Sequence, residues 1–262
     1  MLFDNLKNME SRKKWIQNSV KECKSSYPLP EKLYNGKKAK IAVDIGANVG
    51  GFCIPNAEYF ENIYAFEPFH YNCKVIEEVI NSNPLFKKTI RLYQNAVYSE
   101  SGKILDLMAP NLNCSGDITC IKDGDKSKKI GFKCSTISLN DIFNILPTDK
   151  IDYLKVDCEG SEYEIFENFN DYDKIDIICL EIHGNTGLER KKDLVRELSN
   201  HYRIFFPGHT DAPETPEGDK THGWVELNML WTLDYNKLDN ILCIHKVNSN
   251  PALFPKEMFL EF

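Results

Sequence analysis

The stretch that most constrains the fold is residues 41–50, Ile-Ala-Val-Asp-Ile-Gly-Ala-Asn-Val-Gly, in which an apolar run leads directly into a glycine-containing turn. Only Asp44 interrupts the apolar run, a pattern typical of a strand buried on both faces of a parallel sheet. Gly46 and Gly50 lack a Cβ and let a ligand approach the backbone of a sharp turn, and Asn48 tolerates unusual backbone dihedral angles. We therefore expect these residues to bind a cofactor, with a helix following the turn.

A second acidic residue, Glu67, favours a cofactor site over an ordinary buried strand with a tight turn. Residues 63–68, Ile-Tyr-Ala-Phe-Glu-Pro, form another expected strand, about one helix further along the chain. In a βαβ unit this carboxylate falls beside the first turn, where it can accept hydrogen bonds from ribose hydroxyls. Neither G-x-G-x-x-G nor G-x-x-x-x-G-K-[ST] occurs, and an acidic strand end at Asp44 favours a cationic or hydroxyl-bearing ligand over a pyrophosphate. This ligand profile fits S-adenosylmethionine.

A third expected strand, residues 90–93, adds one more candidate for the cofactor site. An adenine lies near the end of the third strand in this architecture, so Asn95 is a candidate neighbour of the adenine or the ribose. A plain turn residue is an equally good interpretation of Asn95.

The length and charge of the chain exclude several classes of protein. With 262 residues, the chain can form one large α/β domain with an added segment. A formal net charge of −7 argues against nucleic acid as a partner, because phosphate binding needs a positive surface. No apolar run approaches the length that spans a membrane, and the amino terminus lacks a signal-peptide core, so we expect a cytoplasmic protein.

Alternating strand and helix patterns predict a helical extension, residues 1–38, followed by one α/β domain, residues 39–262. In the extension, apolar residues recur at helical spacing between charged ones, which is the pattern of an amphipathic helix. The domain should contain a mostly parallel sheet of seven strands with helices on both faces, and the last two strands are expected at 202–206 and 227–233. Residues 98–139 consist of short alternating segments between turns, which indicates an inserted antiparallel hairpin region.

Four ionisable residues come at or just after the ends of two apolar strands, near the expected cofactor site. They are Asp157, Glu159, Glu181 and His183. Burying unpaired charge is costly, so these groups imply a pairing partner or a cation. In one hypothesis Asp157, Glu181 and His183 bind a divalent ion such as Mg²⁺ or Mn²⁺, which would lower the pKa of a substrate hydroxyl. In another, no metal is bound and His183 or Glu159 is the general base. A purely structural alternative has Glu159 capping the next helix and His183 bonded to a backbone carbonyl.

The sequence resembles the FkbM-type methyltransferase family through motifs that run from about residue 40 to 235 in the family order. The motifs are Asp44-Ile-Gly-Ala-Asn-Val-Gly50, Phe66-Glu-Pro68, Asn95-Ala-Val97, Ser138-Leu-Asn-Asp141, Ile151-Asp-Tyr-Leu-Lys-Val-Asp-Cys-Glu-Gly-Ser-Glu162 and Glu181-Ile-His183. The resemblance implies a Rossmann-like, class I S-adenosylmethionine-dependent O-methyltransferase with Asp44, Gly46, Asn48 and Glu67 on the cofactor. In catechol O-methyltransferase, carboxylates at the ends of the fourth and fifth strands hold Mg²⁺, and Asp157 and Glu181 look similar to these ligands. The family acts in natural-product and glycan pathways, so the expected acceptor is a sugar hydroxyl.

Two other functions fit parts of the pattern. One is a non-catalytic cofactor-binding module of a larger glycan-modifying polypeptide, and the presence of Glu159, Glu181 and His183 argues against it. The other is a nicotinamide-dependent oxidoreductase, which the missing pyrophosphate loop disfavours. Residues 1–38 and the Pro- and Gly-rich loop 207–223 lie outside the resemblance, and we expect them to contact the acceptor, a small molecule or glycan with a free hydroxyl.

Overall fold

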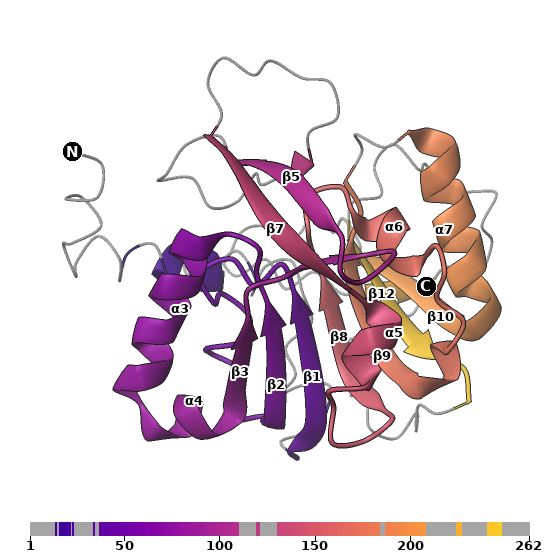
Figure 1. Ribbon diagram of the computed structural model, residues 1–262. Helices are drawn as coiled ribbons and strands as arrows, with labels where there is room; N and C mark the ends of the chain where they lie inside the picture. Colours follow the sequence, from indigo (N-terminus) through magenta and orange to yellow (C-terminus); the bar gives the residue numbers. More distant parts are fainter. Residues whose placement is uncertain are drawn as a thin grey trace, which may run out of the picture.

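An eight-stranded sheet forms the centre of the protein (Figure 1). The computed structural model describes residues 14, 16–21, 23, 34, 37–109, 119–120, 130–183, 187–207, 224–226 and 240–247. Within this part of the chain the strand order is β11-β10-β12-β9-β8-β1-β2-β3. The strands are β1 (Ala39–Ile45), β2 (Phe60–Phe66), β3 (Ile90–Tyr93), β8 (Ile151–Val156), β9 (Ile175–Glu181), β10 (Tyr202–Pro207), β11 (Trp224–Glu226) and β12 (Asn240–His245).

The sheet is mixed, although its central part is parallel as predicted. β3, β2, β1, β8 and β9 pair in parallel, and their apolar runs are buried as such strands require. β12 runs antiparallel to both β9 and β10, and β11 runs antiparallel to β10. The sequence did not predict β12, and the strand expected at 227–233 lies outside the described residues. One reversed strand, β12, thus lies between β9 and β10, and the described sheet has eight strands where seven were predicted.

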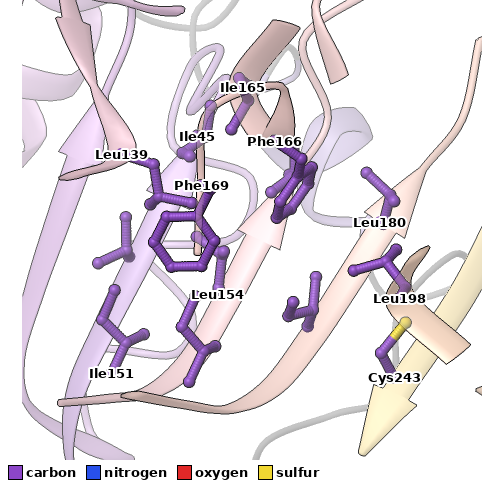
Figure 2. Close-up of a cluster of buried hydrophobic side chains, with 14 of the residues drawn as sticks. Ile45, Leu139, Ile151, Leu154, Ile165, Phe166, Phe169, Leu180, Leu198 and Cys243 are labelled. Atoms are coloured by element: carbon purple, nitrogen blue, oxygen red, sulfur yellow. The ribbon is translucent and has the colours of Figure 1, made fainter. Parts of the chain in front are cut away.

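Helices cover both faces of the sheet, as predicted. The described helices are α3 (His70–Ser82), α4 (Pro84–Thr89), α5 (Leu139–Phe143), α6 (Glu162–Phe166), α7 (Leu188–His201) and the short 3₁₀ helix Tyr172–Lys174. On one face, Leu139, Phe166 and Leu198 from α5, α6 and α7 pack with the strands in a single core cluster (Figure 2). On the other face, Ile76 of α3 packs with Ala42 of β1. Successive strand residues point to opposite faces, so one apolar strand supplies both clusters.

The connection from β1 to β2 differs from the predicted helix. Residues 48–59 form a series of turns rather than a regular helix. Gly50 and Gly51 have a low helix propensity, and Pro55 lacks the backbone N–H that a helix needs. Apolar side chains of this segment are nevertheless buried in the core, among them Phe52, whose ring stacks on Tyr153 with 5.2 Å between centroids. The connection therefore fills the place of a helix without its regular hydrogen bonding.

A second, four-stranded sheet confirms the predicted hairpin insertion and lies beyond the carboxyl ends of the central strands (Figure 1). Its strands are β4 (Ala96–Tyr98), β5 (Ile104–Ala109), β6 (Thr119–Cys120) and β7 (Ile130–Ser138). β5 is antiparallel to β6 and β7, whereas β4 pairs with β7 in parallel. The Phe132 ring of β7 lies 4.9 Å from the Phe69 ring, centroid to centroid, so the insertion packs on the segment that follows β2.

The few described residues of the predicted extension contact the domain. Residues 16–21 are helical, and Ser19 within them is buried. A Cβ on Gly51 would lie 2.8 Å from the Ser19 carbonyl oxygen, which leaves no room for a side chain there. Most of residues 1–38 and of the loop 207–223 lies outside the described residues. None of the helices in the described ranges is long and apolar enough to cross a membrane.

Candidate active site

The parallel strands bring the predicted ionisable residues to one edge of the sheet. Asp44 lies near the end of β1, and the registers place Ile45 beside Phe66 of β2 and Val156 of β8. Val156 in turn lies beside Leu180 of β9. The residues that follow these positions therefore emerge side by side. They are Glu67, Asp157, Glu181 and His183.

The turn after β1 and the turn after β8 are in close contact. Gly46 has φ +75°, and a Cβ built on it would lie 2.8 Å from the carbonyl carbon of Asp157 and closer still to its oxygen. Asp157 also donates its backbone N–H to the carbonyl of Ile45 at 3.1 Å. Asn48 adopts a left-handed φ of +52°, in line with the tolerance expected of asparagine. Gly46 is thus required both by its dihedral angle and by the approach of the Asp157 backbone.

The carboxylate of Glu67 is buried and turned toward the first turn. Its Oε2 accepts the backbone N–H of Asn48 at 2.8 Å, and its Oε1 accepts the backbone N–H of Phe69 at 2.9 Å. Burial raises the pKa of Glu67 to about 7, although these hydrogen bonds act in the opposite direction. A carboxylate oxygen can accept more than one hydrogen bond, so Oε2 retains capacity for a ligand hydroxyl.

A buried lysine, Lys155 of β8, connects the two turns. Its Nζ donates to the carbonyl of Gly46 at 2.7 Å and lies 3.3 Å from Oδ1 of Asp44 and 3.5 Å from Oδ2 of Asp157. Burial lowers the pKa of Lys155, but the two carboxylates outweigh it and hold the pKa above its ordinary value. Burial raises the pKa of Asp44, and Lys155 lowers it in part. The ammonium group therefore compensates a charge that would otherwise be costly inside the protein.

His183 lies among three glutamates. Its Nδ1 is 2.9 Å from Oε1 of Glu162, and its Nε2 is 3.3 Å from Oε2 of Glu159 and 3.7 Å from Oε1 of Glu181. Burial lowers the pKa of His183, but the hydrogen bond and charge of Glu162 and the charges of Glu159 and Asp157 together raise it to about 9. His183 therefore makes carboxylate contacts on both ring nitrogens.

The side chains able to hold a metal ion differ in part from the predicted set. Within the described residues, ligand atoms of Asp157, Glu159 and His183 all lie within 4.8 Å of one another. The sequence predicted Asp157, Glu181 and His183, so the structure gathers two of these residues and adds Glu159. Glu159 has φ +58°, a conformation that non-glycine residues adopt at a cost of about 1–3 kcal/mol and that is concentrated at functional sites. Residue 161, not Glu159, is the N-cap of α6.

Asn95 lies between β3 and β4 and contacts the second sheet. Its side-chain amide donates to the backbone carbonyl of Ser135 at 3.2 Å and to the Ser135 hydroxyl at 2.9 Å. These contacts anchor the second sheet to the end of β3. A role for Asn95 in binding adenine or ribose stays a prediction.

Two residues of the site were not selected from the sequence, namely Lys155 and Glu162. A single lysine in an apolar strand gives no pattern that identifies its partners, which are Asp44 of β1, Gly46 of the turn after β1 and Asp157 of the turn after β8. Glu162 occupies the first turn of α6, where an acidic residue is ordinarily explained by the helix dipole. Full burial of both side chains is the signal that distinguishes them, and the structure alone supplies it.

A family model and several solved structures match the chain. The methyltransferase FkbM domain matches residues 44–204, more than half of the chain. Methyltransferase FkbM from Methylobacillus flagellatus KT has a TM-score of 0.46 at 13% identity over 92% of this chain, which spans 60% of that protein. The precorrin-6y C5,15-methyltransferase from Geobacter metallireducens GS-15 gives 0.44 at 12% identity, with 83% of this chain and 86% of that chain covered.

TrmK from M. capricolum, solved with the cofactor product S-adenosyl-homocysteine, gives 0.42 at 13% identity, with 90% of this chain and 76% of that chain covered. Curated protein sequences give no match. The family match contains the turn after β1 and every strand end of the candidate site. The chain belongs to the FkbM methyltransferase family.

Proposed function

We propose that the protein is an S-adenosylmethionine-dependent O-methyltransferase that methylates a hydroxyl group of a sugar or glycan acceptor. The observation that carries the proposal is the contact between Gly46 and Asp157. It places a turn suited to a cofactor directly against a group of residues suited to binding and deprotonating a hydroxyl. Methyl transfer needs these two functions side by side, because proximity and orientation supply a large part of the rate acceleration.

The residues of the first turn fit S-adenosylmethionine. Glu67 would accept hydrogen bonds from the ribose hydroxyls, and Asp44, buried near the end of β1, would add a second carboxylate beside the turn. Gly46, Asn48 and Gly50 would let the cofactor approach the backbone, and Gly50 also has a positive φ, +89°. The cofactor supplies a methyl group on a positively charged sulfur.

The residues after β8 and β9 would act on the acceptor. Asp157, Glu159 and His183 would hold the hydroxyl by hydrogen bonds and orient its oxygen toward the cofactor side of the site. The hydroxyl proton would pass to Oε2 of Glu159 or, in molecules in which His183 is unprotonated, to Nε2 of His183, and these two atoms lie 3.3 Å apart. The positive charge of Lys155 or of protonated His183 would stabilise negative charge that develops on the oxygen.

A divalent cation such as Mg²⁺ or Mn²⁺ also fits this group, and we propose it as part of the mechanism. The ligand atoms of two carboxylates and one imidazole lie within 4.8 Å of one another. Such a set of ligands can bind a hard or borderline divalent ion. Asp157, Glu159 and His183 would hold the ion, with Glu181 adjacent at 3.7 Å from Nε2 of His183. A bound ion lowers the pKa of a coordinated hydroxyl.

The charges at this edge favour a neutral acceptor over a nucleic acid. The side chains of Asp157, Glu159 and Glu181 are each partly exposed there, which would repel the phosphates of RNA or DNA. A sugar hydroxyl carries no such charge. The glycan class itself is supported by the resemblance to the FkbM family.

The test measures methyl transfer from S-adenosylmethionine to a panel of mono- and oligosaccharides, with Mg²⁺ or Mn²⁺ and with EDTA. We expect Asp157→Ala to abolish turnover and to bind S-adenosylhomocysteine about as well as the wild type. Asp171→Ala is the matched control, since Asp171 pairs with Lys174 on the surface at 2.9 Å. Activity retained in Asp157→Ala would remove Asp157 from the mechanism, and RNA methylation in place of sugar methylation would refute the acceptor class.

A further inference from the structure

Glu162 is a fully buried carboxylate whose contacts all lie within the candidate site. Its Oε1 accepts the backbone N–H groups of Gly160 at 3.0 Å and of Cys158 at 3.3 Å. The same oxygen lies 2.9 Å from Nδ1 of His183. Glu162 begins α6, but it turns back toward the preceding turn rather than toward solvent. Oε1 of Glu162 thus connects the turn after β8 to His183, two residues after the end of β9.

The direction of the contact with His183 follows from the other two hydrogen bonds. Because Oε1 of Glu162 accepts from two backbone N–H groups, it is an acceptor, and Nδ1 of His183 must donate to it. The other ring nitrogen, Nε2, then faces Glu159 and Glu181 at 3.3 and 3.7 Å. A carboxylate that binds one ring nitrogen of histidine fixes both the orientation of the ring and the role of the second nitrogen.

The same side chain supports the unusual conformation of Glu159. The turn it bonds, residues 158–160, contains Glu159 at φ +58° and Gly160 at φ +109°. Such backbone conformations persist only where surrounding contacts hold them. The N–H groups on either side of Glu159 both point at Glu162, so the placement of the Glu159 carboxylate also depends on Glu162.

We infer that Glu162 is the positioning residue of the site, which holds His183 with Nε2 directed at the reacting groups and holds the turn that presents Glu159. It does not contact the acceptor or the cofactor itself. This inference rests on the proposed function, because it assigns Glu162 its effect through His183 and Glu159. A role limited to packing of α6 predicts a loss of stability alone, whereas a positioning role predicts a loss of kcat at unchanged cofactor affinity.

α6 offers a matched control in Glu164. Its side chain is also buried, but its Oε1 pairs with Arg190 of α7 at 3.1 Å. Glu162→Gln keeps an oxygen that can accept from the two backbone N–H groups, so the fold should be retained. The negative charge of Glu162 beside Nδ1 of His183 is lost. Glu164→Gln removes one buried charge from the same helix and weakens a different ion pair, the one with Arg190.

The first experiment observes the contact itself by NMR of the ¹⁵N-histidine-labelled protein, with the His183 signals identified from their absence in His183→Asn. We expect a downfield Nδ1–H proton of His183 that exchanges slowly with water. In Glu162→Gln this proton should move upfield and exchange at least about tenfold faster, and in Glu164→Gln it should not change. Absence of a protected Nδ1–H in the wild type, or an unchanged signal in Glu162→Gln, would overturn the inference.

The second experiment measures kinetics with a sugar that the wild type methylates. Loss of an orienting carboxylate typically costs 10–100-fold in activity, so Glu162→Gln should lower kcat by about that factor. Its Kd for S-adenosylhomocysteine should stay within about twofold of the wild type, and Glu164→Gln should retain full kcat. Equal losses of kcat in the two variants, or loss of cofactor binding in Glu162→Gln, would refute the positioning role.

The Nδ1–H signal of the wild type keeps the inference testable if Glu162→Gln is poorly folded, because its absence overturns the inference without any variant. A double variant tests the inference further if Glu162→Gln is folded. Glu162→Gln added to His183→Asn should lower kcat by a smaller factor than Glu162→Gln lowers it in the wild type, because only the effect through Glu159 remains, whereas equal factors in the two backgrounds would contradict the inference. If the wild type transfers no methyl group to any acceptor, the proposed function fails. The Nδ1–H measurement then still decides the contact between Glu162 and His183.

Discussion

Substitution of Gly46 by alanine tests the contact on which the proposed site depends, and Gly102 provides a control with nearly the same backbone angle. Gly46 has φ +75° and Gly102 has φ +77°, so both variants place alanine in the left-handed region. That conformation costs about 1–2 kcal/mol for a residue with a Cβ. Nothing lies within 4 Å of a Cβ on Gly102, whereas a Cβ on Gly46 would overlap the Asp157 backbone.

The extra cost at Gly46 can be estimated from the contacts that must break. The turn after β1 has to move away from Asp157, which removes the Asp157 N–H bond to Ile45 (3.1 Å) and the Lys155 bond to the Gly46 carbonyl (2.7 Å). A neutral hydrogen bond contributes about 1 kcal/mol and one to a charged group about 2 kcal/mol. With the dihedral cost of about 1–2 kcal/mol, we expect Gly46→Ala to lose about 4–5 kcal/mol and Gly102→Ala about 1–2 kcal/mol of unfolding free energy.

The assay is urea denaturation followed by circular dichroism, with calorimetric titration of S-adenosylhomocysteine on the folded variants. Gly46→Ala should also lose cofactor binding, because the same turn is the proposed cofactor site, and Gly102→Ala should bind normally. Equal destabilisation of the two variants would show that the backbone approach of Asp157 to Gly46 does not contribute. Normal cofactor binding by Gly46→Ala would refute the placement of the cofactor at this turn.

Two further predictions concern the buried charges. Burial raises the pKa of Glu67 to about 7, and ribose hydroxyls bind its ionised form, so the affinity for S-adenosylhomocysteine should fall by about tenfold per pH unit below pH 7. Titrations from pH 5.5 to 8 should show this slope in the wild type but not in Glu67→Gln, and a pH-independent Kd in the wild type would contradict it. Because the folded pKa of Glu67 lies above its ordinary value, its contribution to stability is present at low pH and is lost as the pH rises through about 7. Lys155→Met should lower the unfolding free energy by about 3–5 kcal/mol, since it leaves buried Asp44 without its cation. Lys133→Met, which breaks the exposed pair with Asp106, should lower the unfolding free energy by no more than about 1 kcal/mol in the same urea assay. A similar loss in both variants would show that the buried pair contributes no more to stability than the exposed pair.

The central fold was predictable because its signals are local. A parallel strand buried on both faces is a short apolar run, and the runs that end near Asp44, Glu67 and Asp157 could be located from the sequence alone. Their pairing order then places these acidic ends together. The insertion was also recognisable, because alternating segments between glycine-containing turns give an antiparallel pattern.

What could not be predicted depends on contacts distant in sequence. β12 is a short apolar run that pairs with β9 on one side and with β10 on the other, and nothing in residues 240–245 indicates those neighbours. The segment 48–59 has apolar residues that favour a helix, yet its glycines and Pro55 prevent a regular one.

The same limit applies to the site. Glu159 lies close to Asp157 and His183 because its backbone has a positive φ. The sequence does not predict a positive φ for a glutamate. Lys155 and Glu162 acquire their roles from burial against partners in β1 and in the turns at the strand ends. The acidic residues at the ends of apolar strands were thus predictable, whereas Lys155 and Glu162, which support them, were not.

Calorimetric titration of the protein with S-adenosylhomocysteine, repeated with Mg²⁺, with Mn²⁺ and with EDTA, tests the proposed function most directly. We predict saturable binding of one equivalent in all conditions, because the cofactor turn does not depend on an ion. A separate heat of binding for the ion, lost in Asp157→Ala, is predicted for the metal-assisted mechanism, and its absence would favour the metal-free one. No binding of S-adenosylhomocysteine under any condition would contradict the assignment of the turn after β1 as a cofactor site.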